Sequence, residues 1–249
     1  MLSDKPWKLE GILHLMVGIF VCLSCVVLVE SAAQHFVGKE KFVEGSLLYL
    51  IFSSLSIHGS ILLATFFYLR WHGVSWSEAF GFSTPPLGRA ILLGVVVALA
   101  FLPVGMVLQE VSIRLLGWFH FHAPPQAAVD EFTKAASPAS RAYLAFFAIF
   151  LAPVAEEILF RGILYSALKQ IGYPRFALWG SAVAFAAIHL NAPIFLPLLV
   201  LGLALAWLYE RTNNLLATIT AHSLFNAINV ALLYAGDYLE KMYNQRFHF

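Results

Sequence analysis

Long apolar stretches alternate with short polar segments along most of the chain. Three such stretches come first, at Gly11–Val29, Gly45–Leu69 and Ala90–Leu108, and none of them contains Asp, Glu, Lys or Arg. A helix needs about 20 apolar residues, rising about 1.5 Å each, to cross a bilayer core about 30 Å thick. Each stretch therefore predicts a transmembrane helix.

The second half of the chain predicts four more spans. The run Ala142–Ala155 is too short to cross alone, so its helix has to continue through charged residues to about Leu168. Phe176–Tyr209 is too long for one span. A break at Asn191–Pro193 divides it into a fifth and a sixth span, because proline cannot continue a helix ladder. Leu215–Ala235 is the seventh span.

The pattern predicts an all-α fold, a polytopic transmembrane helical bundle of about seven to eight spans with a polar cavity inside the membrane. A single membrane domain covers residues 1–249, with N-terminal spans at 1–116, a polar connecting loop at 117–141 and a core with the candidate chemistry at 142–235. Lys5 and Lys8 give the first span some likeness to a signal peptide, but its length and the spans that follow favour an uncleaved anchor.

Composition supports a membrane protein. Hydrophobic residues make up 60% of the chain and charged residues 12%, against about 25% charged in typical soluble proteins, and the mean hydropathy is +0.79. The net charge of +1 offers no basic face, so no nucleic-acid partner is expected. Lys and Arg divide evenly between the two sides, so the positive-inside rule gives no orientation. We expect an integral, multi-pass protein with membrane lipid around it.

Three charged residues, Glu156, Glu157 and Arg161, fall on one expected span. A charged side chain at the bilayer centre costs about 2.5–3.5 kcal/mol on insertion scales, so these residues must face a protein interior or a hydrated cavity. Glu157 and Arg161 are four residues apart, share one helix face and are predicted to form an ion pair. Glu156 is rotated about 100° away, which leaves its carboxylate available for chemistry.

Two later spans carry further polar side chains. His189 lies near the end of the fifth span, with Phe185 one turn earlier, and His222 and Asn226 share a face of the seventh. Each of these alone is compatible with packing or with interhelical hydrogen bonds. Together with Glu156, they are polar groups on three spans that can meet at one depth, which favours a functional site.

Other chemically distinctive residues in the expected spans have simpler interpretations. Cys22 and Cys25 form a CxxC spacing, but no βαβ pattern typical of redox proteins surrounds it. We interpret both as small apolar residues of a spanning helix. His14 and His58 stand alone in the first two spans and are interpreted as packing or pore-facing residues.

A carboxylate, two imidazoles and an amide suit the attack of water on an amide carbonyl. Glu156, assisted by His189, can take a proton from water as general base, while His222 and Asn226 can donate to the oxyanion. The alternative is zinc, with Glu156, His189 and His222 as ligands and water as the fourth. The usual His-Glu-x-x-His signature is absent and Asn226 suits an oxyanion better than zinc, so a reaction without metal or other cofactor is favoured.

Three segments resemble the motifs of the CAAX protease and bacteriocin-processing (Abi) family of intramembrane endopeptidases. APVAEEILFRG at Ala152–Gly162 resembles the first motif, and FAAIH at Phe185–His189 resembles the second. RTNN at Arg211–Asn214, followed by HSLFN at His222–Asn226, resembles the third. The order and the spacing agree, and the resemblance covers the chain from Tyr143 to Ala235.

This resemblance implies a helical membrane fold around a conical cavity and glutamate-dependent endopeptidase chemistry without metal, although the family has also been described as metal-dependent. The roles that it implies are water activation by Glu156 and His189, an oxyanion hole from His222 and Asn226, and support by Glu157, Arg161 and Phe185. The expected partner is a peptide or a lipidated-protein substrate. The compact chain resembles the prokaryotic branch, which implies a prokaryotic cytoplasmic membrane.

Two functions from other classes stay open. Intramembrane ionisable residues also mark ion pathways, so a proton-coupled transporter is one alternative. However, the chain has neither an inverted repeat nor the paired broken helices expected of such carriers. The other is a non-catalytic membrane protein that binds a peptide, as in immunity. Loss of peptide cleavage when Glu156 is replaced would separate the enzyme from both.

Overall fold

The computed structural model describes residue 7 and residues 9–38, 42–83, 86–120 and 126–247, and these residues form helices without any strand. Lys5 and Lys8 lie outside the described residues. The α-helices are α1 (Leu9–Val37), α2 (Leu47–Ser54), α3 (Ser60–Trp71), α4 (Trp76–Phe80), α5 (Leu87–Trp118), α6 (Ala127–Lys134), α7 (Pro138–Phe146), α8 (Ala152–Glu157), α9 (Ser166–Gln170), α10 (Pro174–Ala187), α11 (Ala192–Thr212) and α12 (Leu215–Phe247). Three π-helical segments connect some of them, namely η2 (Leu55–Gly59), η3 (Phe147–Leu151) and η4 (Ile158–Tyr165). The predicted all-α membrane bundle is confirmed.

Six helices in the described part of the chain are long and apolar enough to cross a membrane. They cover Glu10–Phe36, Leu47–Trp71, Leu87–Trp118, Pro138–Gln170, Ala192–Thr212 and Leu215–Gly236. The expected fifth span is the exception, because α10 has only 14 residues. At about 1.5 Å per residue it is about 21 Å long, less than the bilayer core. Pro174 begins this helix, and a turn at Ile188 and His189 follows its end.

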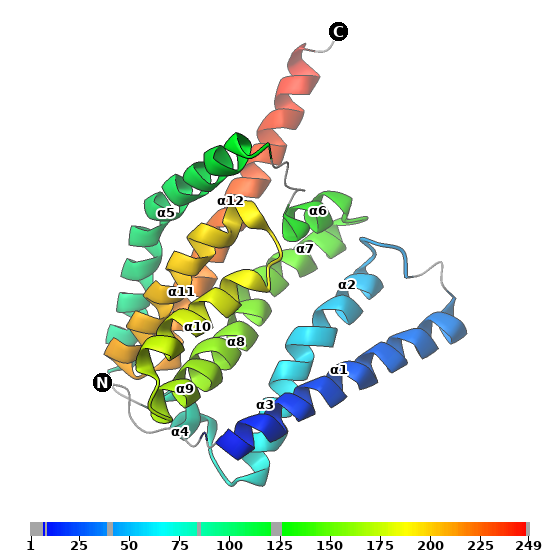
Figure 1. Cartoon of the computed structure of the whole chain (residues 1–249). Coiled ribbons are helices and arrows are strands. Elements are labelled where there is room, and N and C mark those ends of the chain that lie inside the picture. The colour runs from blue at the N-terminus through cyan, green and yellow to red at the C-terminus, as the bar shows by residue number, and fades with distance from the viewer. Residues whose placement is uncertain (1–6, 8, 39–41, 84–85, 121–125, 248–249) are drawn as a thin grey trace.

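The helix that runs from α7 to α9 separates two groups of helices. On one side α5, α10, α11 and α12 pack against one another, and on the other α1 packs against α3 (Figure 1). The intervening helix contacts both groups, because α8 touches η2 as well as α12, and α7 touches α2. The helix with the paired glutamates is therefore enclosed from both sides.

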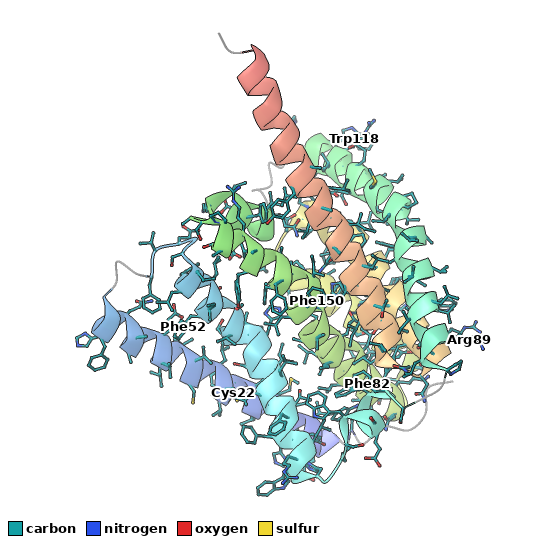
Figure 2. All side chains as sticks on the ribbon, turned by 180° about the vertical axis from the view of Figure 1, so that it is seen from behind. Cys22, Phe52, Phe82, Arg89, Trp118 and Phe150 are labelled. Carbon is teal, nitrogen blue, oxygen red and sulfur yellow. The ribbon has the colours of Figure 1, made fainter. Side chains whose placement is uncertain are left out.

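Apolar side chains fill the interior and also cover the outside. Phe80, Phe185, Leu205 and Tyr209 are fully buried. Large apolar side chains nevertheless project outward all round the bundle (Figure 2). On α5, for example, Met106 is 68% exposed, and the helix has Arg89 near one end and Trp118 at the other (Figure 2). So much exposed apolar surface fits a protein surrounded by lipid rather than by water.

Gly202 allows α11 to approach α10 closely. A Cβ atom at this position would lie 3.0 Å from both the Cα and the Cβ of Ala182. This is closer than packed carbon atoms normally approach. The close approach matters for the polar cluster described below, since the Gly202 carbonyl oxygen accepts a hydrogen bond from Arg161.

The expected polar connection at 117–141 contains the short helix α6, whose Glu131 gives a pH-dependent prediction. Burial and the nearby carboxylates of Glu44 and Asp130 raise the pKa of Glu131, and Lys134 only partly offsets them. A raised carboxyl pKa in the folded state stabilises the fold at low pH, and that stability is lost as pH rises through the folded-state value. We expect Glu131→Gln to raise the Tm at pH 7 by about 1–2 °C and to leave it unchanged near pH 4.

Thermal unfolding in detergent at the two pH values measures this difference. Glu110→Gln on α5 is the control, because the Glu110 carboxylate is exposed and paired with Arg114. An equal change of Tm for Glu131→Gln at both pH values would show that ionisation of Glu131 is not its cause.

Candidate active site

The paired glutamates lie at the C-terminal end of α8, inside the protein. Glu157 and Arg161 are both fully buried, and Glu156 is 8% exposed. The ion pair expected from the four-residue spacing is present, with Nη1 of Arg161 2.7 Å from Oε1 of Glu157. The Arg161 guanidinium also donates to the Gly202 carbonyl at 3.3 Å and stacks over the Phe185 ring at 4.3 Å. These contacts hold Oε1 of Glu157, and its supporting role stays a prediction.

His222 of α12 lies between the two carboxylates. Its Nδ1 is 2.9 Å from Oε1 of Glu157, and its Nε2 is 3.9 Å from Oε2 of Glu156. Because a carboxylate only accepts hydrogen bonds, Nδ1 of His222 carries a proton. Nε2 can then donate to an oxyanion only if His222 is an imidazolium. The oxyanion role predicted from the sequence thus requires a positive charge on this ring.

A positive charge on His222 would balance the net negative charge of the buried groups around it. Two carboxylates, Glu156 and Glu157, and one guanidinium leave one negative charge uncompensated when both acids are ionised. Uncompensated charge is costly in a low-dielectric interior. An imidazolium at His222, which is only 3% exposed, would neutralise the cluster.

His189 follows α10 in a turn and is partly exposed. Its Nδ1 is 2.8 Å from the Phe185 carbonyl oxygen, and its ring meets the Phe185 ring edge-on with centroids 5.2 Å apart. Since a carbonyl only accepts, Nδ1 carries the proton and the neutral ring presents Nε2 as an acceptor. His189 and Glu156 interact electrostatically, although no hydrogen bond joins them in the described structure.

Asn226 lies one turn after His222 on α12, as the spacing predicts, and is partly exposed. Its Nδ2 donates a hydrogen bond to the Ala148 carbonyl oxygen at 2.8 Å. Ala148 belongs to the π-helical segment η3, and π-helical turns are frequent at functional sites. The amide group has two N–H donors, so one remains for a ligand after this bond.

His58 is a member of the cluster that the sequence did not identify. Its Nε2 is 3.3 Å from Oε1 of Glu156, and its ring stands edge-on to Phe147 with centroids 4.8 Å apart. Expected only to pack or to face a pore, it instead reaches the glutamate across a sequence separation of 98 residues. The one available signal was an isolated imidazole in a span without Asp, Glu, Lys or Arg, because lone polar groups in lipid are costly.

The alternative hypothesis of a zinc site was compared with the side chains in the part of the chain that the structure describes. There, no three His, Cys, Asp or Glu side chains are grouped so that they can hold a metal ion. The Nδ1 atoms of His189 and His222 bind Phe185 and Glu157, which leaves Nε2 of each ring as the nitrogen that could bind a metal. Whether the reaction needs zinc stays a prediction.

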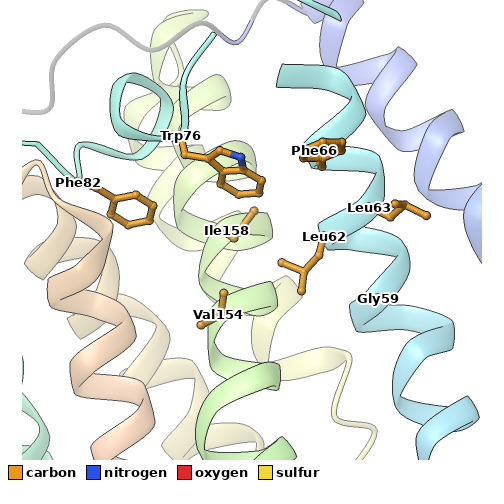
Figure 3. Close-up of a pocket in the computed structure, with 8 residues that line it drawn as sticks. All are labelled: Gly59, Leu62, Leu63, Phe66, Trp76, Phe82, Val154 and Ile158. Atoms are coloured by element: carbon orange, nitrogen blue, oxygen red, sulfur yellow. The ribbon is translucent and has the colours of Figure 1, made fainter. Parts of the chain in front are cut away.

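An apolar cavity of about 490 Å³ lies beside the glutamate helix, between it and α3. Figure 3 shows Val154 and Ile158 on the glutamate helix facing Leu62 and Phe66 of α3, with Trp76 closing one end. Val154 and Ile158 lie two residues before and two residues after Glu156, so they point to a different face of the helix from Glu156. The cavity is therefore on another face of the glutamate helix than the polar cluster, and Glu156 does not line it.

An ionisable cluster inside a helical bundle with an apolar exterior defines an integral membrane protein with an intramembrane polar site. Residues 138–228 match a family model described as "Type II CAAX prenyl endopeptidase Rce1-like". This segment is therefore similar to the Rce1-like family, and the family resemblance seen in the motifs is confirmed. The matched segment contains all the candidate residues from Glu156 to Asn226 but not His58.

Curated bacterial proteins are similar to parts of this chain. The chain is 33% identical over 95 residues to "Putative membrane peptidase YdiL" of Bacillus subtilis, an alignment that covers 37% of this chain and 39% of that protein. It is 29% identical over 121 residues to "Uncharacterized protein YpbD" of the same organism, covering 47% of this chain and 58% of the relative. It is also 30% identical over 77 residues to "UPF0177 protein YxdF" of Lactococcus lactis, covering 30% of this chain and 42% of the relative.

The chain thus spans between 39% and 58% of the length of these relatives. No solved structure matches it. The family model is described as an endopeptidase, and one of these relatives is named as a putative membrane peptidase.

Proposed function

We propose that the protein is an intramembrane endopeptidase that hydrolyses a peptide bond of a membrane-associated or amphiphilic substrate. The observation that carries the proposal is the buried cluster in which Glu156 lies beside the imidazoles of His58 and His222 while Arg161 and His222 contact Oε1 of Glu157. Each glutamate has an Oε2 without a hydrogen-bond partner among the described side chains, but only Glu157 is paired with a guanidinium, whereas the ion-pair contacts of Glu156 are with imidazoles.

In the proposed reaction, Glu156 acts as general base. Its Oε2 has no hydrogen-bond partner among the described side chains, so it can accept a proton from water while the water oxygen bonds to the carbonyl carbon. His189 presents Nε2 as a second acceptor, which orients the water. The proton held by Glu156 then passes to the amine nitrogen as the C–N bond breaks.

The negative oxygen of the tetrahedral intermediate needs donors that are already in place. An imidazolium at His222 supplies Nε2–H, and Asn226 supplies the Nδ2–H that Ala148 leaves unused. Preorganised donors in a water-poor site are among the largest contributions to catalysis, and loss of one typically lowers kcat about 10²- to 10³-fold. No cofactor takes part in this scheme.

Substrate and location follow from the surroundings of the cluster. The apolar cavity on another face of the glutamate helix suits the apolar part of an amphiphilic peptide or the lipidated tail of a protein. The curated relatives are bacterial, which supports the cytoplasmic membrane of a prokaryote as the location.

The proposal is tested by comparing membranes that contain the wild-type protein with membranes that contain His189→Ala. We expect new protein termini, detected by mass spectrometry, only with the wild-type protein. Identical termini in both membranes, with both proteins folded, would contradict the proposal.

The transporter alternative predicts a different result. Proteoliposomes containing the wild-type protein would then carry a proton flux that Glu156→Gln removes, without any new protein termini. A peptide-binding protein without catalysis would show neither signal.

A further inference from the structure

We infer that His58 is a positioning residue, which holds the Glu156 carboxylate in the orientation that leaves Oε2 free to activate water. The inference rests on the proposed function. It assigns a role to the N-terminal helices, which lie outside the family match at residues 138–228.

The contact divides the two oxygens of Glu156 between two tasks. Oε1 faces Nε2 of His58 at 3.3 Å, whereas Oε2 has no hydrogen-bond partner among the described side chains and lies 3.9 Å from Nε2 of His222. A carboxylate held at one oxygen cannot rotate freely about its terminal bond. The other oxygen therefore keeps a fixed direction, which general-base catalysis requires.

The protonation of His58 follows from the same atoms. The Glu156 carboxylate accepts, so Nε2 of His58 donates and the neutral ring has no proton on Nδ1. Nδ1 is buried without a hydrogen-bond partner, so a proton there would be an unsatisfied buried donor. The contact with Glu156 thus places a proton on Nε2 of His58.

Local packing keeps the ring in this place. His58 lies in the π-helical segment η2 and its ring rests edge-on against Phe147 of η3. Two π-helical segments thus meet at this contact. One helix in the N-terminal group is thereby tied to the helix that carries the paired glutamates.

Three substitutions at position 58 distinguish positioning from packing. The amide nitrogen of Gln reaches about as far from the backbone as Nε2 of His, whereas that of Asn reaches only as far as Nδ1. Phe preserves the ring but has no donor. We expect His58→Gln to keep kcat within about threefold of the wild type. We expect His58→Asn and His58→Phe to lower kcat about 10- to 100-fold, the usual cost of removing an orienting partner, with KM unchanged.

The rates are measured with the full chain in detergent against a mixed library of quenched fluorescent peptides, and thermal unfolding reports on folding. His14→Phe is the matched control, since His14 is an exposed histidine of α1, and it should leave the rate unchanged. If His58→Phe does not fold, the comparison of kcat between His58→Gln and His58→Asn tests the inference. Equal rates for these two variants, at any level, would overturn the inference.

The experiment distinguishes a failure of the proposed function from a failure of the role inferred for His58. If Glu156→Gln cleaves peptides as fast as the wild type, Glu156 is not the general base and the proposed function fails. If Glu156→Gln is inactive while His58→Asn and His58→Phe match the wild type, only the role of His58 is wrong.

Discussion

Replacing Glu156 with Gln is expected to lower the rate of peptide cleavage by about 10²- to 10⁴-fold, the usual contribution of a general base. Gln has nearly the same shape and can still accept the hydrogen bond from His58, but it cannot take a proton from water. The Tm should therefore stay close to that of the wild type. Single-turnover cleavage of a quenched fluorescent peptide, with unfolding followed in parallel, measures both quantities.

Glu110→Gln provides the control for this substitution. Glu110 lies on α5, exposed and paired with Arg114, so the same chemical change there should leave the rate unaltered. Glu156→Gln with more than about a tenth of the wild-type rate would contradict the assignment of Glu156 as base.

Replacing Arg161 with Met is expected to destabilise the protein by about 3–5 kcal/mol, because it leaves a buried carboxylate without its partner. The Arg161 side chain is 1% exposed and that of Glu157 is fully buried, so water cannot take over the lost contacts. The hydrogen bond to Gly202 and the stacking on Phe185 are lost as well. Denaturation of the protein in mixed micelles measures the change in the free energy of unfolding.

Arg114→Met is a closely matched control. Arg114 and Glu110 are also four residues apart, with their atoms 2.6 Å apart, but their side chains are 75% and 56% exposed. Exposed pairs of this kind contribute about 0.3–0.5 kcal/mol. The double variant Glu157→Gln/Arg161→Met removes the buried charge together with its partner, so it should be more stable than Arg161→Met alone. Equal losses for Arg114→Met and Arg161→Met would refute the importance of burial.

Local spacing predicted several features of the fold. Uncharged runs of about 20 residues identified most of the spans, and the break expected at Asn191–Pro193 coincides with the start of α11 at Ala192. Helix ends were less predictable. The helix α5 continues ten residues past Leu108 to Trp118, because apolar residues alone do not determine where a helix stops. The length of α10 depends on its two flanking turns rather than on its hydrophobicity.

Within the site, contacts along one helix were predictable and contacts between helices were not. The ion pair between Glu157 and Arg161 follows from helical periodicity. The bonds from His222 to Glu157 and from Asn226 to Ala148 depend on how α12 packs against the glutamate helix. The contact of His58 with Glu156 is the extreme case, because nothing near His58 in the sequence indicates its partner. The assigned roles of Glu156, His189, His222 and Asn226 stay predictions.

The π-helical segments also bear on how this chain tolerates changes in its length. A π-helical turn holds one residue more than an α-helical turn, so deleting a residue from Phe147–Leu151 can be absorbed by tightening that turn. The same deletion inside α8 would rotate the residues after it by about 100° relative to those before it, turning Glu156 away from His222. Single-residue insertions and deletions between homologous proteins should therefore concentrate in such wide turns, and deletion scanning of residues 147–157 would reveal this pattern directly.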